Sequence, residues 1–338
     1  MSLQQWVQDN WQQKNSIFAI LKPLSWLFGG LVKLRKTAYK RGWVESLGVD
    51  VPVIIVGNIS VGGTGKTPVV MWLAQQLKAR GYRPGIISRG FGGSGQMQIA
   101  LVNSDAKTVG DEPLMIAQRT GCPMMIGADR AAVANAMRRF YPMCNVFICD
   151  DGLQHYHLKR TVELVVVDAT RGLGNGELLP AGSLREPAQR LQTVDAVIIN
   201  GRLNTAVALP LGTTPSFGMQ IVGEDFTNLT DAQLTVKAEF FAGKNVKAIA
   251  GIGNPQRFFA QLTQLGVQFE PIMFDDHHAY TAQELVKLNA EIIVMTEKDA
   301  VKCQAFAQTN MWMLPVEAEI SSDLTDLMVA KIGKPISC

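Results

Sequence analysis

The clearest chemistry in the sequence belongs to a glycine-rich loop. A short apolar, β-branched run at 53–56 leads into the segment 57–67, GNISVGGTGKT, and a helical pattern follows. Glycines in such a loop let successive backbone N–H groups converge on phosphate oxygens, while a lysine reaches the β- and γ-phosphates and a hydroxyl holds Mg²⁺. Gly65, Lys66 and Thr67 have these properties. The sequence therefore predicts a nucleotide-binding site that also uses Mg²⁺.

One position departs from the general pattern G-x-x-x-x-G-K-[ST]. Ser60 stands where the first glycine of that pattern is expected. The strand before the loop and the glycine pair inside it still favour nucleotide binding over an incidental glycine turn. The residues expected to contact the nucleotide are Ser60, Gly62, Gly63, Thr64, Gly65, Lys66 and Thr67.

A phosphate loop also needs an acidic residue at the end of a neighbouring strand, where it holds the metal or its waters. Asp150 and Asp151 follow the apolar run 146–149 and meet this need. A single aspartate after a strand is often only a turn residue, but two in tandem favour metal binding. The strand expected at 162–167 ends in the same way at Asp168, with weaker support.

The four histidines form two pairs, His155 with His157 and His277 with His278. Each pair follows two consecutive aspartates within a few residues. Zinc binding is one interpretation, but no further ligands stand at helical or zinc-finger spacing. Structural roles stay open for His155 and His157. For His277 we favour catalytic support near phosphate, because adjacent carboxylate and imidazole groups can orient a hydroxyl nucleophile.

Alternating apolar strands and helical stretches over 52–200 predict the framework that positions these groups. Strands are expected at 53–56, 85–88, 123–127, 145–150, 162–167 and 195–199. Helices are expected at 66–80, 111–120 and 129–140. This rhythm indicates an α/β fold with a doubly wound, mostly parallel sheet, in which ligands bind at the carboxyl ends of the strands.

The pattern changes from about residue 205. Polar-interrupted strands near 217–221 and 234–241 suggest a β-ribbon, and strands near 268–273, 291–295 and 311–315 imply a second, smaller α/β domain. The G-x-G at 251–253 lacks the third glycine and the downstream acid of a dinucleotide site. The expected parts are an N-terminal membrane-interface segment at 1–42, a P-loop domain at 43–204, a β-ribbon linker at 205–245 and a C-terminal domain at 246–338.

The N-terminal segment is rich in tryptophan, which favours the boundary between lipid and water. A helix over 24–41 would have two opposite faces, one with Leu24, Leu27, Phe28, Leu31 and Leu34 and the other with Lys33, Lys36 and Lys40. Lys22 and Pro23 argue against a helix that crosses the bilayer. We expect an amphipathic helix at the membrane surface, with its lysines near anionic head groups. Packing of the apolar face on the protein body is the alternative.

Composition and charge narrow the class of protein. The chain has 338 residues, of which 47% are hydrophobic and 18% charged, which excludes disorder. Residues 1–50 carry a net charge of +4 and the remainder sums to −1, so a nucleic-acid-binding body is not expected. Five cysteines without C-x-x-C spacing indicate neither a disulfide framework nor a thiolate metal site, and fit a reducing compartment.

Several motifs taken together resemble the tetraacyldisaccharide 4′-kinase family, whose members phosphorylate a lipid A precursor in Gram-negative bacteria. They span most of the chain and are more specific than the phosphate loop alone. The motifs are GN at 57–58 leading to GGTGKTP at 62–68, SRGFG at 88–92, VGDEP at 109–113, DDGLQH at 150–155, LLPAG at 178–182, LREP at 184–187, DHH at 276–278 and TEKD at 296–299. In this resemblance, serine at position 60 belongs to the family pattern.

The resemblance implies ATP and Mg²⁺, and a tetraacylated glucosamine disaccharide 1-phosphate as acceptor of the γ-phosphate at its 4′-hydroxyl. It implies that Asp111 activates this hydroxyl with His277, across two domains that approach each other, and that Lys66 is catalytic. Mg²⁺ would be served by Thr67, Asp150, Asp151 and Glu186. The implied substrate-binding candidates are Arg89, Gln154, His155 and Arg185.

The same resemblance implies a location at the cytoplasmic face of the bacterial inner membrane, as a peripheral, monotopic protein on an anionic leaflet. No obligate protein partner and no nucleic acid are expected. Two other functions stay open. A regulatory NTPase switch is one, although a subgroup with a lysine directly before GGxGKT is disfavoured because Val61 stands there. A soluble small-molecule kinase is the other, and it would leave the tryptophan-rich start unexplained.

Overall fold

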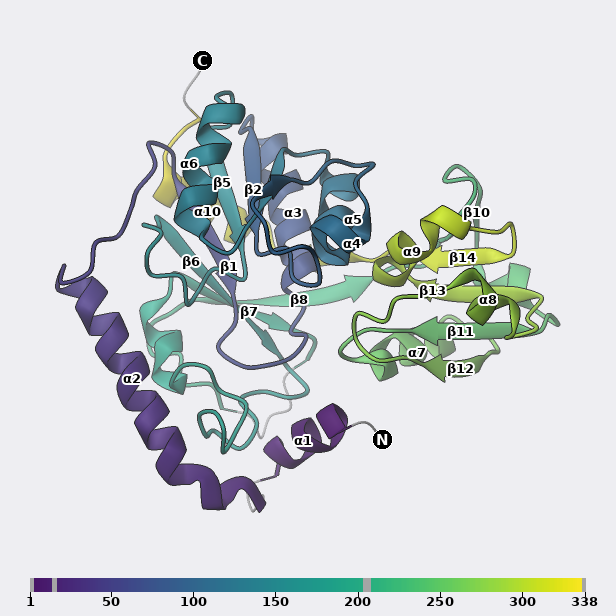
Figure 1. The fold of residues 1–338 in the computed structure, drawn as a ribbon, viewed down its shortest axis with the longest axis horizontal. Helices are drawn as coiled ribbons and strands as arrows, with labels where there is room; N and C mark the ends of the chain where they lie inside the picture. Colours follow the sequence, from purple (N-terminus) through teal and green to yellow (C-terminus); the bar gives the residue numbers. More distant parts are fainter. Residues whose placement is uncertain (1–2, 14–16, 203–207, 336–338) are drawn as a thin grey trace.

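The strands in the described part of the chain form two sheets (Figure 1). The computed structural model describes residues 3–13, 17–202 and 208–335. The larger sheet has nine strands in the order β15-β8-β7-β6-β1-β5-β2-β4-β3, and the smaller has six in the order β10-β9-β14-β13-β11-β12. The predicted α/β class with a mostly parallel main sheet is confirmed.

The phosphate loop follows the central strand of the larger sheet. The strands of this sheet are β1 (Val53–Gly57), β2 (Pro84–Ser88), β3 (Gln98–Ile99), β4 (Met124–Ile126), β5 (Val146–Asp150), β6 (Val162–Asp168), β7 (Ala196–Asn200), β8 (Ser216–Val222) and β15 (Glu317–Ile320). The strands predicted between 52 and 200 are all present. Since β1 pairs in parallel with both β5 and β6, the loops that follow these three strands share one edge of the sheet.

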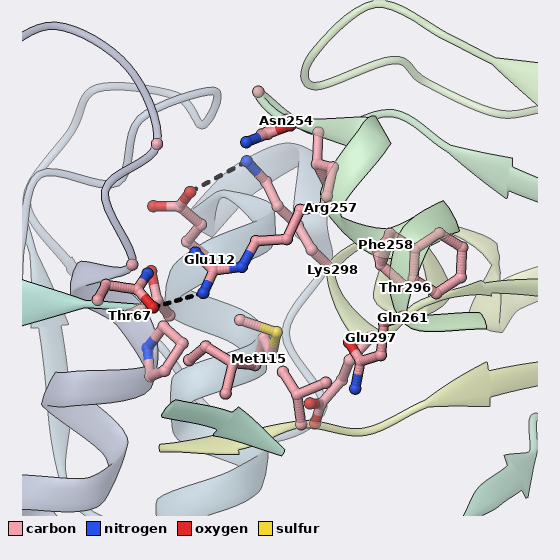
Figure 2. Close-up of a pocket in the computed structure, with 18 of the residues that line it drawn as sticks. Thr67, Glu112, Met115, Asn254, Arg257, Phe258, Gln261, Thr296, Glu297 and Lys298 are labelled. Atoms are coloured by element: carbon pink, nitrogen blue, oxygen red, sulfur yellow. Dashed lines mark hydrogen bonds and ion pairs between the residues drawn. The ribbon is translucent and has the colours of Figure 1, made fainter. Parts of the chain in front are cut away.

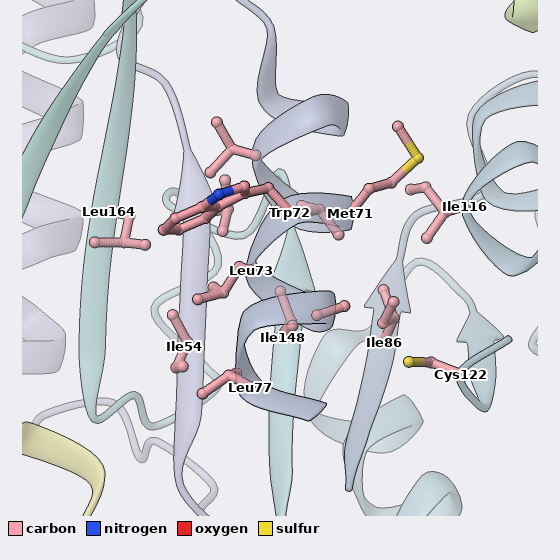
Figure 3. Packing of buried hydrophobic residues seen from close by; sticks show 14 of the residues in the cluster. Ile54, Met71, Trp72, Leu73, Leu77, Ile86, Ile116, Cys122, Ile148 and Leu164 are labelled. Atoms are coloured by element: carbon pink, nitrogen blue, oxygen red, sulfur yellow. The ribbon is translucent and has the colours of Figure 1, made fainter. Parts of the chain in front are cut away.

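Both faces of the larger sheet are buried along its central strands. Its helical elements are α3 (Lys66–Ala79), α4 (Ala106–Val109), α5 (Asp111–Thr120), α6 (Arg130–Phe140), η2 (Ala188–Thr193) and α10 (Asp323–Ile332). Along β1, Ile54 belongs to one apolar core and Ile55 to the other, because side chains of a strand alternate between faces. Figure 3 shows Leu73 and Leu77 of α3 above the strands of the first core. Burial on both sides explains why these strands read as continuous apolar runs.

The smaller sheet has its own aromatic core. Its strands are β9 (Phe226–Asn228), β10 (Thr235–Val236), β11 (Val246–Ala250), β12 (Glu270–Met273), β13 (Ile292–Thr296) and β14 (Met311–Leu314). Its helical elements are η3 (Ala238–Phe241), α7 (Pro255–Gln264), α8 (Ala282–Val286), α9 (Glu297–Cys303) and η4 (Gln304–Phe306). Phe226 and Phe241 pack edge to face at 4.7 Å between ring centroids, and Trp312 contacts Phe241.

Strand pairing differs from the expected β-ribbon at 205–245. β8 adds in parallel to β7 of the larger sheet, and residues 238–241 form a 3-10 helix rather than a strand. The C-terminal segment also returns to the larger sheet, where β15 pairs with β8 and α10 contacts α3. Leu324 and Met328 of α10 are fully buried in the first core, which holds this segment there. The predicted domain limits therefore stay a prediction, and the chain passes between the sheets more than once.

The N-terminal elements border the loop that precedes η2. They are α1 (Leu3–Trp11), η1 (Ile17–Leu21) and α2 (Lys22–Lys40), which Figure 1 shows at the lower edge of the larger sheet. The Ser25 hydroxyl donates to the Leu178 carbonyl at 2.8 Å and accepts from the Ala181 N–H at 3.0 Å. The Trp11 indole donates to the Pro180 carbonyl at 3.1 Å. One side of α2 is thus fixed to the body of the protein.

Candidate active site

The phosphate loop joins β1 to the N-terminus of α3. Gly65 caps this helix with a φ of +94°, and a Cβ at this position would collide with Asn200. The Asn200 side chain donates to the Thr64 carbonyl at 3.0 Å, and the Asn58 side chain donates to the Ser60 carbonyl at 2.7 Å. The loop is therefore held from both sides, with its free N–H groups at a helix N-terminus that favours phosphate.

Ser60 lies at the edge of this loop rather than at its centre. Ser60 forms an isolated antiparallel bridge with Leu184, and the N–H of the neighbouring Val61 donates to the Ser183 carbonyl at 2.8 Å. Ser60 thus connects the loop to the LREP motif. Its predicted contact with the nucleotide stays a prediction, as do those of the other loop residues.

Lys66 and Asp151 face each other where the loop meets the end of β5. The Lys66 Nζ lies 3.5 Å from Asp151 Oδ1, and the Arg185 Nη1 lies 3.4 Å from Asp151 Oδ2. Burial would raise the pKa of Asp151, but the charges of Lys66 and Arg185 outweigh it and hold the pKa below its usual range. Asp151 is therefore ionised and joins two candidate site residues.

Asp150 is a deeply buried carboxylate at this edge. Its Oδ2 accepts from the Ser88 hydroxyl at 3.2 Å, whereas its Oδ1 is buried without a hydrogen-bond partner. Burial raises the pKa of Asp150 to about 7, and the charges of Glu112 and Asp151 add to the increase. A buried carboxylate oxygen without a partner, next to a second carboxylate, is what a bound cation would satisfy.

The donors at this edge fit Mg²⁺. Mg²⁺ prefers oxygen ligands and is usually held by one or two carboxylates together with substrate phosphates and water. Asp150, Asp151 and the hydroxyl of Thr67 supply such oxygens. Among the described residues, no group of three His, Cys, Asp or Glu side chains is arranged to hold a metal by itself. A site completed by nucleotide phosphates is consistent with this arrangement.

Glu186 lies in a separate hydrogen-bond network. It is 1% exposed and accepts from the Gln154 side chain at 2.9 Å, from the Tyr156 hydroxyl at 2.7 Å and from the Arg190 Nε at 3.2 Å. Gln154 also donates to the Asn58 carbonyl at 3.2 Å, which ties this network to the start of the phosphate loop. These contacts are those of a residue that positions other side chains. The predicted binding of Mg²⁺ by Glu186 stays a prediction.

Asp111 and His277 are in direct contact. The His277 Nδ1 lies 3.1 Å from Asp111 Oδ1 and 3.0 Å from Oδ2. Asp111 begins α5 on the larger sheet, whereas His277 follows β12 of the smaller sheet and has a φ of +63°. The ring of Phe91 packs on His277 at 4.9 Å between centroids. The structure therefore brings together the two residues that the sequence suggested would act as a unit.

Lys298 adds a positive charge beside this pair, and sequence reasoning assigned it no role. Its Nζ lies 3.0 Å from Glu112 and 3.1 Å from Asp276, and 3.9 Å from Asp111. Burial would raise the pKa of Asp111, but the hydrogen bond from His277 and the charge of Lys298 hold it below its usual range. The hydrogen bond to Asp111 also raises the pKa of His277. The TEKD motif, already noted in the sequence, was the available signal for Lys298.

The remaining histidines have other surroundings than His277. His278 bonds Glu284 at 2.9 Å and stacks on Phe274, so its contacts are separate from those of His277. A His157 ring nitrogen lies 3.1 Å from the Glu45 carbonyl oxygen. Burial, reinforced by the charge of Arg130, lowers the pKa of His155 to about 4. His155 is therefore neutral at pH 7.

A cleft of about 250 Å³ opens between the two sheets beside the phosphate loop. Figure 2 shows that Thr67 and Glu112 line it from the larger sheet, and that Arg257 and Lys298 reach in from the smaller one. The Arg257 Nη2 donates to Asn200 Oδ1 at 2.6 Å. Sequence reasoning missed Arg257 because nothing in its local sequence distinguishes it from a surface arginine.

This edge of the sheet combines a phosphate loop, carboxylates suited to Mg²⁺ and an aspartate-histidine pair that can orient a hydroxyl. Such an arrangement is suited to moving a phosphoryl group from a nucleotide to an alcohol, so fold and site together define a P-loop phosphotransferase. The family model described as tetraacyldisaccharide-1-P 4′-kinase, LpxK, matches residues 17–333, and the chain belongs to this family.

Known members of this family are similar to the chain over nearly its full length. The chain is 47% identical over 335 residues to the tetraacyldisaccharide 4′-kinase of Methylobacillus flagellatus, with 98% of this chain and 97% of the relative covered. It is 49% identical over 316 residues to that of Alkalilimnicola ehrlichii, with 93% and 92% covered. LpxK from Aquifex aeolicus, whose crystal structure was determined in complex with ATP, matches with a TM-score of 0.79 at 28% identity, covering 94% of this chain and 100% of that one. The predicted family and enzyme class are confirmed.

Proposed function

We propose that this chain transfers the γ-phosphate of ATP to the 4′-hydroxyl of a tetraacylated glucosamine disaccharide 1-phosphate, a step of lipid A biosynthesis. The observation that carries the proposal is the contact between Asp111 and His277, 3.0 Å apart beside a phosphate loop. Membership in the kinase family supports the acceptor, and the ATP complex of the Aquifex aeolicus relative supports the phosphate donor.

The residues of the larger sheet would hold the phosphate donor. Backbone N–H groups of the loop and of the first turn of α3 would bind phosphate oxygens, and Lys66 would turn from Asp151 toward the γ-phosphate. When bound, Mg²⁺ neutralises charge on the β- and γ-phosphates. Thr67, Asp150 and Asp151 are the residues that would hold it. The side-chain oxygen of Asp150 that lacks a partner supports this assignment.

Asp111 would orient the acceptor hydroxyl. Its carboxylate accepts a hydrogen bond from the hydroxyl, while His277 fixes the carboxylate and Lys298 keeps it ionised. In phosphoryl transfer, positioning lowers the barrier more than base strength does, so a carboxylate of low pKa is adequate. In this proposal, the predicted domain at 43–204 contributes Asp111 and the predicted domain at 246–338 contributes His277. The substrate-binding candidates are Arg89, Gln154, His155 and Arg185.

The second part of the proposal places the protein on a membrane surface. Leu24, Leu27, Leu31 and Leu34 form an outward stripe on α2 and are all more than half exposed. Among the described residues, the stretch Ile17–Lys40 is long and apolar enough to cross a bilayer, and 6% of its apolar 18-residue window is buried. An exposed apolar stripe of this kind costs free energy in water and gains it among acyl chains.

Contacts of α2 with the protein body favour a helix that lies in the interface over one that spans the bilayer. Ser25 is hydrogen-bonded to the 178–181 loop, and Lys22 pairs with Glu177 at 2.9 Å. Gly29 lies so close to Leu178 that a Cβ would come within 2.7 Å of its Cδ1. A spanning α2 would have to break these contacts. A peripheral, monotopic position on the cytoplasmic face, where ATP is available, agrees with all of them.

Transfer of labelled phosphate from ATP to tetraacyldisaccharide 1-phosphate in detergent micelles tests the activity directly. We expect transfer that requires Mg²⁺. A protein that binds ATP but transfers no phosphate to this acceptor would instead support the NTPase switch. Sedimentation with anionic vesicles tests the second part, and a Leu27→Glu/Leu31→Glu variant should lose most of its binding while it still binds ATP. Equal sedimentation of the two proteins would contradict the interfacial helix.

A further inference from the structure

Arg171 lies over the phosphate loop, although it is distant from it in sequence. It follows β6, in a turn that Asp168 fixes by accepting hydrogen bonds from the Thr170 N–H at 2.8 Å and the Arg171 N–H at 3.1 Å. The Arg171 Nη2 then donates to the Gly253 carbonyl of the smaller sheet at 3.3 Å. The turn after β6 thereby directs the guanidinium into the seam between the two sheets.

Within this seam the guanidinium occupies the space beside Gly62. A Cβ built on Gly62, the third residue of the phosphate-loop pattern, would lie 2.7 Å from the Arg171 Nη1. Gly62 has a φ of +107°, so its backbone also favours glycine. The close approach of arginine to this residue is therefore possible only because no side chain stands there.

This part of the loop faces the acceptor side of the site. A Cβ on Gly253 would lie 3.7 Å from the Gly63 N and 3.4 Å from Asp276 Oδ2, so these three residues meet at one point. His277, which contacts Asp111, is the next residue after Asp276. The β-phosphate belongs at the N-terminus of α3. The Gly62 end of the loop is therefore the end at which the γ-phosphate meets the acceptor.

The charge of Arg171 is available for this phosphate. Three other basic groups of the site have carboxylate partners: Lys66 has Asp151, Arg257 has Asp168 and Lys298 has Glu112. In the described part of the chain, no carboxylate lies within 4.0 Å of the Arg171 guanidinium nitrogens. The hydrogen bond from its guanidinium to Gly253 goes to a neutral carbonyl, and a guanidinium has further N–H donors.

We propose that Arg171 is a catalytic arginine supplied in cis, which contacts the γ-phosphoryl oxygens during transfer; this rests on the proposed kinase function. In that step a bond forms between the acceptor hydroxyl oxygen and the γ-phosphorus, and the bond from the γ-phosphorus to the β–γ bridging oxygen breaks. The electron pair goes to ADP, and the hydroxyl proton passes to Asp111. Negative charge shifts toward the bridging and γ-oxygens, where a guanidinium at Gly62 stabilises it.

The hydrogen bond to Gly253 gives this arginine a second consequence. Because Gly253 lies in the loop that follows β11 of the smaller sheet, Arg171 reaches the phosphate loop in the geometry that also brings His277 to Asp111. Charge stabilisation and orientation of the acceptor are thus assembled together. ATP bound while the sheets are apart would lack both groups, which limits transfer to water.

The test compares Arg171→Ala with Arg171→Lys and with Arg119→Ala as a matched control. Arg119 also links distant elements, and its ion pairs are with Glu297 and Glu317 rather than with a residue of the loop. For Arg171→Ala we expect a fall in kcat of about 10³-fold or more, the range typical of such arginines. Affinities for ATP and ADP should stay within about fivefold, and Arg171→Lys should recover part of the loss. Arg119→Ala should stay within about threefold of wild type.

Binding of ADP with aluminium fluoride and Mg²⁺, measured by calorimetry, supplies a readout that needs no lipid acceptor. It mimics the charge of the transferring phosphoryl group, so the tighter binding of wild type over ADP alone should disappear in Arg171→Ala. An unchanged preference for the fluoride complex in Arg171→Ala would overturn the proposal. Equal losses of ATP and ADP affinity would also overturn it, because they indicate that Arg171 has only a structural role. Failure of wild type to phosphorylate the lipid would count against the proposed function and leave this comparison interpretable.

Discussion

Lys66, Asp150 and Asp151 all come from the nine-stranded sheet, whereas Asp111 and His277 join that sheet to the six-stranded one. The first three residues form the nucleotide side of the site. Neighbouring strands with a fixed register position them, so their arrangement does not depend on the smaller sheet. The acceptor side depends on contacts between the sheets, chiefly those of His277 and Lys298. Substitutions on the two sides should therefore fail in different ways, which gives the comparison its tests.

The largest effect is expected on the nucleotide side. Lys66→Ala removes a fixed positive charge from the transferring phosphate, and kcat should fall on the order of 10²–10⁴-fold. Labelled-phosphate transfer measures it, with Lys78→Ala on the same helix as control because Lys78 donates to the Thr120 carbonyl, away from the loop. Turnover within about threefold of wild type, in a folded variant, would remove the phosphate loop from the mechanism.

On the acceptor side, Asp111→Ala and His277→Ala should each lower kcat by about 10²-fold or more while ATP affinity changes only a few-fold. The two side chains act through one hydrogen-bonded unit, so the double variant should cost much less than the sum of the single changes in free energy. His278→Ala is the control and should be milder, since His278 bonds Glu284 instead. Additive losses would show that the two residues have separate tasks.

Lys298→Met sharpens the comparison further, because Lys298 connects Glu112 of the larger sheet with Asp276 of the smaller. We expect kcat to fall by about tenfold. Loss of the positive charge should also raise the pKa of Asp111, so the acid limb of the kcat profile should move to higher pH. A pH–rate profile beside that of Lys287→Met, an exposed lysine, measures both changes. An acid limb that stays in place would separate Lys298 from Asp111.

The smallest effect concerns stability. The pKa of Asp111 is lowered below 3.8, so its contribution is present above 3.8 and is lost as pH falls through the folded value. The pKa of His277 is raised above 6.5, so its contribution is present below 6.5 and is lost as pH rises through its folded value. The stability difference between wild type and Asp111→Asn should therefore be largest between pH 3.8 and 6.5. Urea unfolding at several pH values checks this, and a difference independent of pH would contradict it.

Most of the larger sheet could be predicted from the sequence, because each buried strand is a continuous apolar run between recognisable turns. The return of β15 and α10 to this sheet could not. The segment Glu317–Ile320 is too short and polar for its pairing with β8 to be predicted. The sequence predicts strand at 238–241, where aromatic residues suit either state, but the segment forms a 3-10 helix in which Phe241 packs against Phe226.

Within the site, the sequence could indicate where a residue lies when that residue directly follows a strand, but it could not show which side chains surround each residue. Asp150 and Asp151 follow a strand directly, so their place beside the loop could be inferred. Glu186 sits in an equally clear motif, yet Gln154, Tyr156 and Arg190 surround it, and no spacing rule shows that. Arg171 carries no motif of its own, and only its approach to Gly62 singles it out.

The sequence by itself determined the phosphate loop, because its strand, glycines, lysine and hydroxyl are consecutive and their geometry follows from local backbone preferences. Asp111 and His277 stand 166 residues apart, and local preferences say nothing of their distance. Only the packing of the two sheets brings them together, with Lys298 between Glu112 and Asp276 at the join. Tertiary structure decides such contacts because they depend on the summed packing of many side chains rather than on any one segment.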